Sequence, residues 1–112
     1  MLKLATLLAA ATISIAPLTL AANGSITITS PVDGAKLDAM AQTKLAYAVV
    51  PGPGGDHTHL YIDGKEVAIL RELEGTRTLE TMTPGAHESC IKLVNKAHTP
   101  IGLQKRIKVT VE

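Results

Sequence analysis

The sequence predicts an all-β fold, an antiparallel sandwich of about seven short strands. Three observations lead to this prediction. After residue 24, apolar residues recur with a period of two, as they do along a strand that buries one face. Clusters of Gly, Pro, Asp and Asn separate these stretches at short intervals. No stretch keeps a helical period over several turns. The expected strands are 25–30, 43–51, 57–62, 66–71, 76–82, 87–94 and 105–112.

Alternation of apolar and polar residues justifies the first two strands and the last. Residues 25–30 read SITITS, in which isoleucine alternates with serine and threonine. In 43–51, a leucine, a tyrosine and a valine fall on one face. In 105–112, an isoleucine and two valines alternate with charged and polar residues. The segment AKLDAMAQT, residues 35–43, is interpreted as a link between the first two strands, with room for one helical turn.

Turn residues set the other boundaries. PGPGGD at 51–56 predicts a loop, because prolines lack a backbone donor and glycines permit unusual dihedral angles. Strands 57–62 and 66–71 flank DGK, a compact turn signal between apolar runs. TPG at 83–85 closes the fifth strand, and NKAHTPIGLQ at 95–104 is expected to be a loop.

The first 22 residues have the features of a secretory signal peptide. Lys3 precedes an apolar run over residues 4–15, and small residues follow that suit cleavage after position 21 or 22. The alternative, a retained membrane anchor, is less favoured because Pro17 interrupts an apolar stretch shorter than the roughly 20 residues that span a bilayer. The sequence thus predicts a periplasmic or secreted protein, with its sandwich domain over 23–112 and no stable membrane insertion after cleavage.

Composition limits the partners and the core. Without Lys3, basic and acidic residues are equal in number, and no basic run occurs, which argues against a nucleic-acid or anionic-membrane partner. There is no Trp or Phe, so the core must consist mainly of Val, Ile, Leu and Ala. Cys90 is the single cysteine, so no internal disulfide can form, although an unpaired thiol outside the cytoplasm can cross-link two chains.

Two segments carry a resemblance to a known fold family. LYIDGKEV resembles the middle hairpin of the immunoglobulin-like domains of exported bacterial proteins, and the chain from 78 to 112 resembles their last three strands. In those domains and in fibronectin type III domains, a Leu-x-Pro-Gly-x-aromatic/His corner leads into the penultimate strand. The sequence also resembles small periplasmic domains of unknown function with a His-x-His strand and a later His. The resemblance implies an immunoglobulin-like sandwich and says little about activity.

The histidines are the candidate functional residues. If Leu60 and Ile62 face the core, His57 and His59 point to the opposite face, toward solvent. In an immunoglobulin-like fold, strands 57–62 and 87–94 are antiparallel neighbours, so the loop that carries His98 emerges at the same end of the sandwich.

Two interpretations of this end remain open. His57, His59 and His98 can form a three-nitrogen site for copper, zinc or nickel, with water or Asp56 as a fourth ligand. A copper or zinc ion would then make the protein a periplasmic metal carrier or buffer. Alternatively, these are polar residues of a wet surface, and the end loops of a non-enzymatic structural or interaction module contact a protein or a glycan.

Two further residues are assigned structural roles. His87 occupies the corner position at which related sandwiches place a tyrosine that bonds to nearby backbone. Cys90 is expected on the same outward face as Tyr61, as a small residue of a half-covered surface.

Catalysis is not predicted. Ser89 is two residues from His87, but both are expected to point toward the interior, and no spacing forces two carboxylates together.

Overall fold

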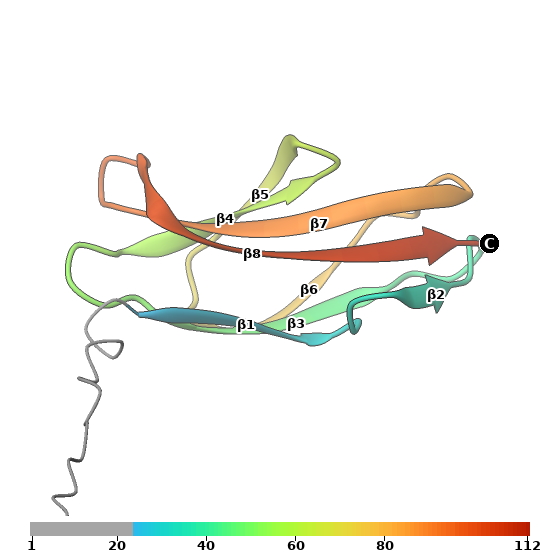
Figure 1. Cartoon of the computed structure of the whole chain (residues 1–112), viewed down its shortest axis with the longest axis horizontal. Coiled ribbons are helices and arrows are strands. Elements are labelled where there is room, and N and C mark those ends of the chain that lie inside the picture. Colours follow the sequence, from blue (N-terminus) through green and yellow to red (C-terminus); the bar gives the residue numbers. More distant parts are fainter. Residues whose placement is uncertain (1–23) are drawn as a thin grey trace, which may run out of the picture.

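The computed structural model describes residues 24–112, which form an all-β sandwich of two sheets (Figure 1). The signal peptide predicted for residues 1–22 lies outside these residues. Among those described, none forms a helix with the length and apolar character needed to cross a membrane. The eight strands in this part of the chain are β1 (Ser25–Ser30), β2 (Ala35–Leu37), β3 (Lys44–Val50), β4 (His57–Ile62), β5 (Lys65–Leu70), β6 (Glu74–Thr78), β7 (Gly85–Val94) and β8 (Pro100–Val111).

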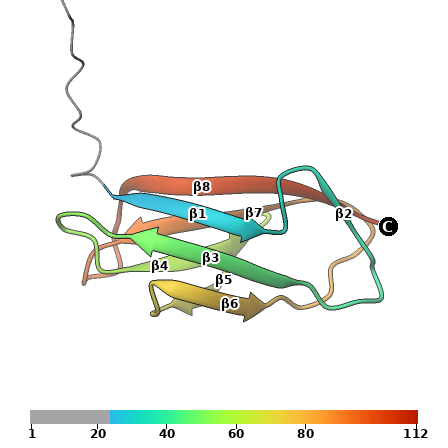
Figure 2. The same ribbon diagram turned by 90° about the horizontal axis from the view of Figure 1, so that it is seen from below.

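The two sheets are of unequal size. One has the order β1-β3-β6, and the other has the order β2-β8-β7-β4-β5 (Figures 1 and 2). The predicted pairing of residues 57–62 with 87–94 is confirmed, since β4 and β7 are antiparallel neighbours from His57 opposite Val94 to Ile62 opposite Ser89. All seven expected segments contain a strand, although β6 begins at residue 74 and β8 at residue 100, both earlier than predicted.

The segment 35–43 differs from the prediction of a link with a helical turn. Ala35–Leu37 forms the additional strand β2, which pairs in parallel with β8 from Ala35 opposite Val109 to Leu37 opposite Val111. The free edge of β8 explains this outcome. Its backbone groups require partners, and Gly34 N–H and Glu112 N–H extend the pairing with bonds to Lys108 O (2.7 Å) and Leu37 O (2.8 Å).

The core lies between the sheets and is aliphatic apart from Tyr47, as a chain without Trp or Phe requires. Both sheets contribute one face of their alternating strands to it. Leu60 and Ile91 are fully buried opposite each other on β4 and β7. The core residues are Ile26, Leu45, Tyr47, Val49, Leu60, Leu70, Leu79, Ile91 and Leu93.

The His87 corner is structural, as predicted. His87 Nε2 donates to Thr83 O at 2.6 Å, and Nδ1 donates to Asp63 Oδ2 at 2.5 Å. Both acceptors are oxygens without a proton, so the ring is doubly protonated. Asp63 Oδ1 accepts Glu88 N–H at 2.8 Å, so this carboxylate joins the β4–β5 turn to β7. The hydrogen bond with His87 lowers the pKa of Asp63, and the hydrogen bond with Asp63 raises the pKa of His87.

This corner predicts a pH-dependent stability. The Asp63 contribution is present above its unfolded pKa near 3.8 and is lost as pH falls through its lowered folded value. The His87 contribution is present below its unfolded pKa near 6.5 and is lost as pH rises through its raised folded value. The Asp63→Asn substitution keeps an oxygen for Glu88 N–H but removes the charge. We expect wild type to have a higher free energy of unfolding than this variant, measured with denaturant. The difference should be largest between pH 3.8 and pH 6.5, the unfolded pKa values of the two groups. A difference independent of pH would contradict the ion pair, and exposed Glu74→Gln is the charge control.

Thr58 supplies a second test of the fold. Its side chain faces the core between the two histidines of β4, it is 1% exposed, and Oγ1 has no hydrogen-bond partner within residues 24–112. A buried unpaired hydroxyl costs about 1–3 kcal/mol. We expect Thr58→Val to raise the free energy of unfolding by about 1 kcal/mol and the melting temperature by about 4–8 °C. The exposed Thr27→Val on β1 is the control. Destabilisation by Thr58→Val would show that the hydroxyl has a partner.

Candidate metal centre

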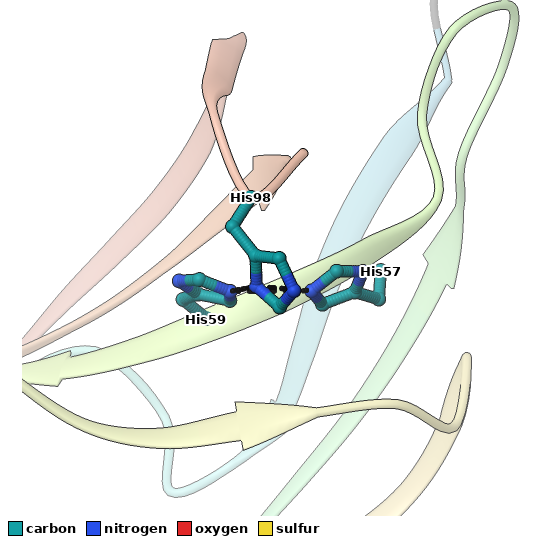
Figure 3. A group of neighbouring side chains, drawn as sticks. All are labelled: His57, His59 and His98. Atoms are coloured by element: carbon teal, nitrogen blue, oxygen red, sulfur yellow. Dashed lines mark hydrogen bonds between the residues drawn. The ribbon is translucent and has the colours of Figure 1, made fainter. Parts of the chain in front are cut away.

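Three histidines meet at the end of the sandwich where the β3–β4 and β7–β8 connections lie (Figures 1 and 3). His57 and His59 are alternate residues of β4 and therefore project from one face of the sheet. His98 belongs to the connection between β7 and β8, and its ring points down between the other two (Figure 3). We call His57, His59 and His98 the histidine centre.

The ring nitrogens of the histidine centre form a nearly equilateral triangle. His57 Nε2 lies 3.2 Å from His59 Nε2 and 3.2 Å from His98 Nδ1. His59 Nε2 lies 3.1 Å from His98 Nδ1. The predicted convergence of residues separated by up to 41 positions is thus present. Among the described residues, these three are the group of His, Cys, Asp and Glu side chains whose ligand atoms lie close enough to hold one metal ion.

Burial of the histidine centre differs from the sequence expectation. His57 and His59 were expected to face solvent, but they are only 2% and 5% exposed. They do lie on the face of β4 opposite the core residue Leu60, as expected, so they are outside the hydrophobic interior. The β7–β8 connection accounts for the difference, because it places the ring of His98 against both rings, with centroid separations of 4.6 Å and 5.2 Å. His98 itself is exposed, so the centre has one ligand at the surface.

Asn95 holds the connection that carries His98. Its Oδ1 accepts the N–H groups of Ala97 (2.9 Å) and Thr99 (3.0 Å), and its carbonyl oxygen accepts His98 N–H at 2.9 Å. His98 has a φ of 65°, in the left-handed region, where a residue other than glycine is strained. The local sequence therefore imposes an uncommon backbone conformation on the residue whose ring completes the triangle.

Two carboxylates contact the outer nitrogens of the buried rings. Asp56 Oδ2 lies 2.8 Å from His57 Nδ1, and Glu66 Oε1 lies 3.1 Å from His59 Nδ1. Asp56 was predicted as a fourth ligand, but its contact is on the ring nitrogen that faces away from the triangle. Glu66 was not predicted. The Asp63–Gly64 turn pairs Ile62 with Lys65 and Tyr61 with Glu66, so Glu66 lies on the same face of the sheet as His59. This hairpin register was the sequence signal that could have identified Glu66.

These carboxylate contacts determine the tautomer that a neutral ring adopts at His57 and at His59. A carboxylate only accepts hydrogen bonds, so Nδ1 of His57 and Nδ1 of His59 each carry the proton. In the neutral rings, both Nε2 atoms then present lone pairs to each other at 3.2 Å. His98 Nδ1 can donate a single proton, which satisfies one of them. Two or three converging lone pairs in a nearly water-free position are unfavourable without a cation.

The dimensions of the triangle suit a transition metal ion. Zinc–imidazole bonds are about 2.0–2.1 Å long, and an ion at that distance from all three nitrogens would have N–metal–N angles of about 100°, close to tetrahedral. A fourth position then remains for water or another ligand. Carboxylates that accept from the far nitrogens of ligand histidines are the usual outer partners of such metal sites.

Cys90 lies beside Tyr61 in the β4–β7 register, as expected, but away from the histidine centre. The expected half-covered position is wrong, because the thiol is 4% exposed. Burial raises its pKa, which disfavours the thiolate form. Across the same face, Lys92 Nζ lies 4.5 Å from the centre of the Tyr61 ring.

Comparisons with known proteins identify the fold. No family model and no curated protein matches the sequence. Among solved structures, the chain is similar to fibronectin(III)-like modules of CbhA from Clostridium thermocellum, with 14% identity and a TM-score of 0.66, over 81% of this chain and 47% of that one. A lytic polysaccharide monooxygenase from Jonesia denitrificans matches with 14% identity and a TM-score of 0.51, over 70% of this chain and 58% of that one.

The CARDB domain of a Pyrococcus furiosus protein, in complex with di-metal ions, matches with 13% identity and a TM-score of 0.57, over 80% of this chain and 87% of that one. The chain thus spans about half the length of the first two structures. At these identities the likeness concerns the fold alone. The predicted architecture is confirmed: residues 24–112 are an immunoglobulin-like, fibronectin III-like β-sandwich domain.

Proposed function

We propose that this domain binds one divalent transition metal ion through His57 Nε2, His59 Nε2 and His98 Nδ1. The observation that carries the proposal is the triangle of ring nitrogens at 3.1–3.2 Å. Two of its corners are the Nε2 atoms of rings whose Nδ1 atoms donate to carboxylates. A cation at its centre satisfies three lone pairs at once. In this proposal Asp56 is a positioning residue and not the ligand that the sequence suggested.

Copper is the metal we propose first. Divalent copper binds a given nitrogen site more tightly than nickel or zinc, and an all-imidazole set suits all three. Zinc fits the near-tetrahedral angles and is the second candidate. The proposed leader of residues 1–22 would deliver the domain to the periplasm or the exterior. The exposed ligand His98 and the free fourth position favour a carrier or buffer, from which a metal can pass to another protein.

We propose binding rather than catalysis. The hollow beside the histidine centre is lined by Gly54, Gly55, Asn95, Lys96 and Ala97, and thus carries one charged side chain. A second cavity of about 350 Å³ lies on the core side of β4 and is lined largely by apolar residues such as Leu60, Ile62 and Met82. The second cavity also has Thr78, Glu80 and Thr81 in its lining, but among the described residues no hydrogen bond joins either hydroxyl to the Glu80 carboxylate, as a nucleophile and its base would require.

The metal site is tested by titration of wild type and a His57→Ala, His59→Ala, His98→Ala triple variant with Cu(II) and with Zn(II). We expect wild type to bind one equivalent of Cu(II), with an EPR spectrum that shows nitrogen ligands. The triple variant lacks the ligands themselves. Its metal affinity should therefore fall by more than the roughly 100-fold that the loss of an outer hydrogen-bond partner can cost. Lys96→Ala, in the same connection, is the matched control. Circular dichroism checks that the variants are folded.

Equal, weak uptake of Cu(II) and Zn(II) by wild type and the triple variant would contradict the proposal. That result would favour the alternative function, in which the end loops bind a protein or a glycan.

The role of Asn95 gives an independent test. Asn95→Ala removes the oxygen that accepts from Ala97 and Thr99, so His98 is less constrained before binding. We expect the metal affinity to fall about tenfold, toward the lower end of the effect of outer-partner mutations. An affinity equal to that of wild type would show that the connection needs no such support.

A further inference from the structure

We infer that Asp56 and Glu66 make the histidine centre selective for a divalent over a monovalent ion, so that it holds Cu(II) or Zn(II) in preference to Cu(I). This inference rests on the proposed metal site and assigns a specificity role to two residues that do not touch the metal themselves. Both act through the ligand rings and are therefore positioning residues.

The two carboxylates are placed equivalently around the centre. Each accepts from Nδ1 of one buried ring, at 2.8 Å for Asp56 and 3.1 Å for Glu66. They come from different elements: Asp56 belongs to the β3–β4 loop and directly precedes β4, and Glu66 belongs to β5, which pairs with β4. The histidine side chains are 3% and 6% exposed, whereas the carboxylates are 37% and 44% exposed. The two carboxylates thus lie at the rim of the centre, partly exposed to solvent.

Charge balance distinguishes the two classes of ion. Three neutral imidazoles leave the charge of a bound ion uncompensated, and the two carboxylates supply two negative charges through the rings. A divalent ion makes the assembly neutral, whereas Cu(I) leaves one excess negative charge. An unbalanced charge in a largely dehydrated position is unfavourable. The partial exposure of both carboxylates reduces this penalty, because water screens them.

The hydrogen bonds act in the same direction. A carboxylate that accepts from Nδ1–H makes the opposite nitrogen a more basic donor. More basic nitrogen ligands favour divalent copper or zinc, whereas soft sulfur ligands favour Cu(I). The one thiol of the chain, Cys90, is not in the group of ligand atoms.

Nearby cations do not neutralise the carboxylates. In the described part of the chain, the ion-pair partners of Asp56 and Glu66 are His57 and His59 alone. Lys92 lies opposite His59 in β7, but its Nζ is over the ring of Tyr61. The two negative charges are therefore available to a bound ion.

The experiment is a comparison of Cu(II), Zn(II) and Cu(I) affinities by competition with chelators for each ion. The double variant Asp56→Asn, Glu66→Gln keeps an oxygen that accepts from Nδ1–H and removes both charges. We expect its loss of affinity for Cu(II) and Zn(II) to be at least tenfold larger than its loss of affinity for Cu(I), so that the Cu(II)-to-Cu(I) affinity ratio falls at least tenfold and the copper reduction potential rises. Glu74→Gln on the other sheet controls for a general change in net charge.

The outcomes separate this inference from the proposed function. If wild type binds Cu(II) through the three histidines but the double variant keeps the wild-type Cu(II)-to-Cu(I) ratio, the selectivity role is wrong and the metal site stands. Equal losses for all three ions would show that the carboxylates only orient the rings, which also overturns it. If neither wild type nor the histidine variant binds any ion specifically, the proposed function fails and the inference fails with it. A thermal melt of each variant without metal excludes misfolding as the cause.

Discussion

The tautomer of two neighbouring histidine rings is the constraint on which the rest of the candidate site depends. Asp56 and Glu66 place the protons of His57 and His59 on the outer nitrogens, and the pleat of β4 then directs the two unprotonated nitrogens at each other. The ring of His98 packs against both of them, and His57 and His59 are buried. Burial makes the unpaired ring nitrogens unfavourable when no cation is bound, and the same nitrogens can bind a metal ion.

The residues of the histidine centre are separate from the residues that form the hydrophobic core of the sandwich. Leu60 and Thr58 point to the core side of β4, whereas His57 and His59 point to the outer side, so a single strand serves both. The distant end of β4 is held by a separate device, the Asp63–His87 pair and its contacts to Thr83 and β7. Immunoglobulin-like sandwiches host many functions. Here the residues of the candidate metal site lie on the β3–β4 and β7–β8 connections and on the outer face of one sheet.

The sequence predicted the sandwich and the end at which the histidines meet, because alternation and turn residues are local signals and the β4–β7 pairing follows from the fold family. It did not predict β2, since AKL carries little strand signal and forms a strand only because the edge of β8 is free. It predicted the face of His57 and His59 but not their burial, which depends on the conformation that Asn95 imposes on the following connection. Asp56 was recognised as part of the site, but sequence proximity does not say which ring nitrogen a carboxylate reaches, and its contact is with the His57 nitrogen that faces away from the triangle.

Nitrogen-15 NMR of the histidine side chains reports the tautomer of each ring, because the ring nitrogen shifts depend on which atom carries the proton. We expect His57 and His59 to be Nδ1–H tautomers without metal. One equivalent of Zn(II) should shift their Nε2 signals and the Nδ1 signal of His98, while His87 stays unchanged. Protons on Nε2 of both buried rings, with no response to Zn(II), would contradict the account.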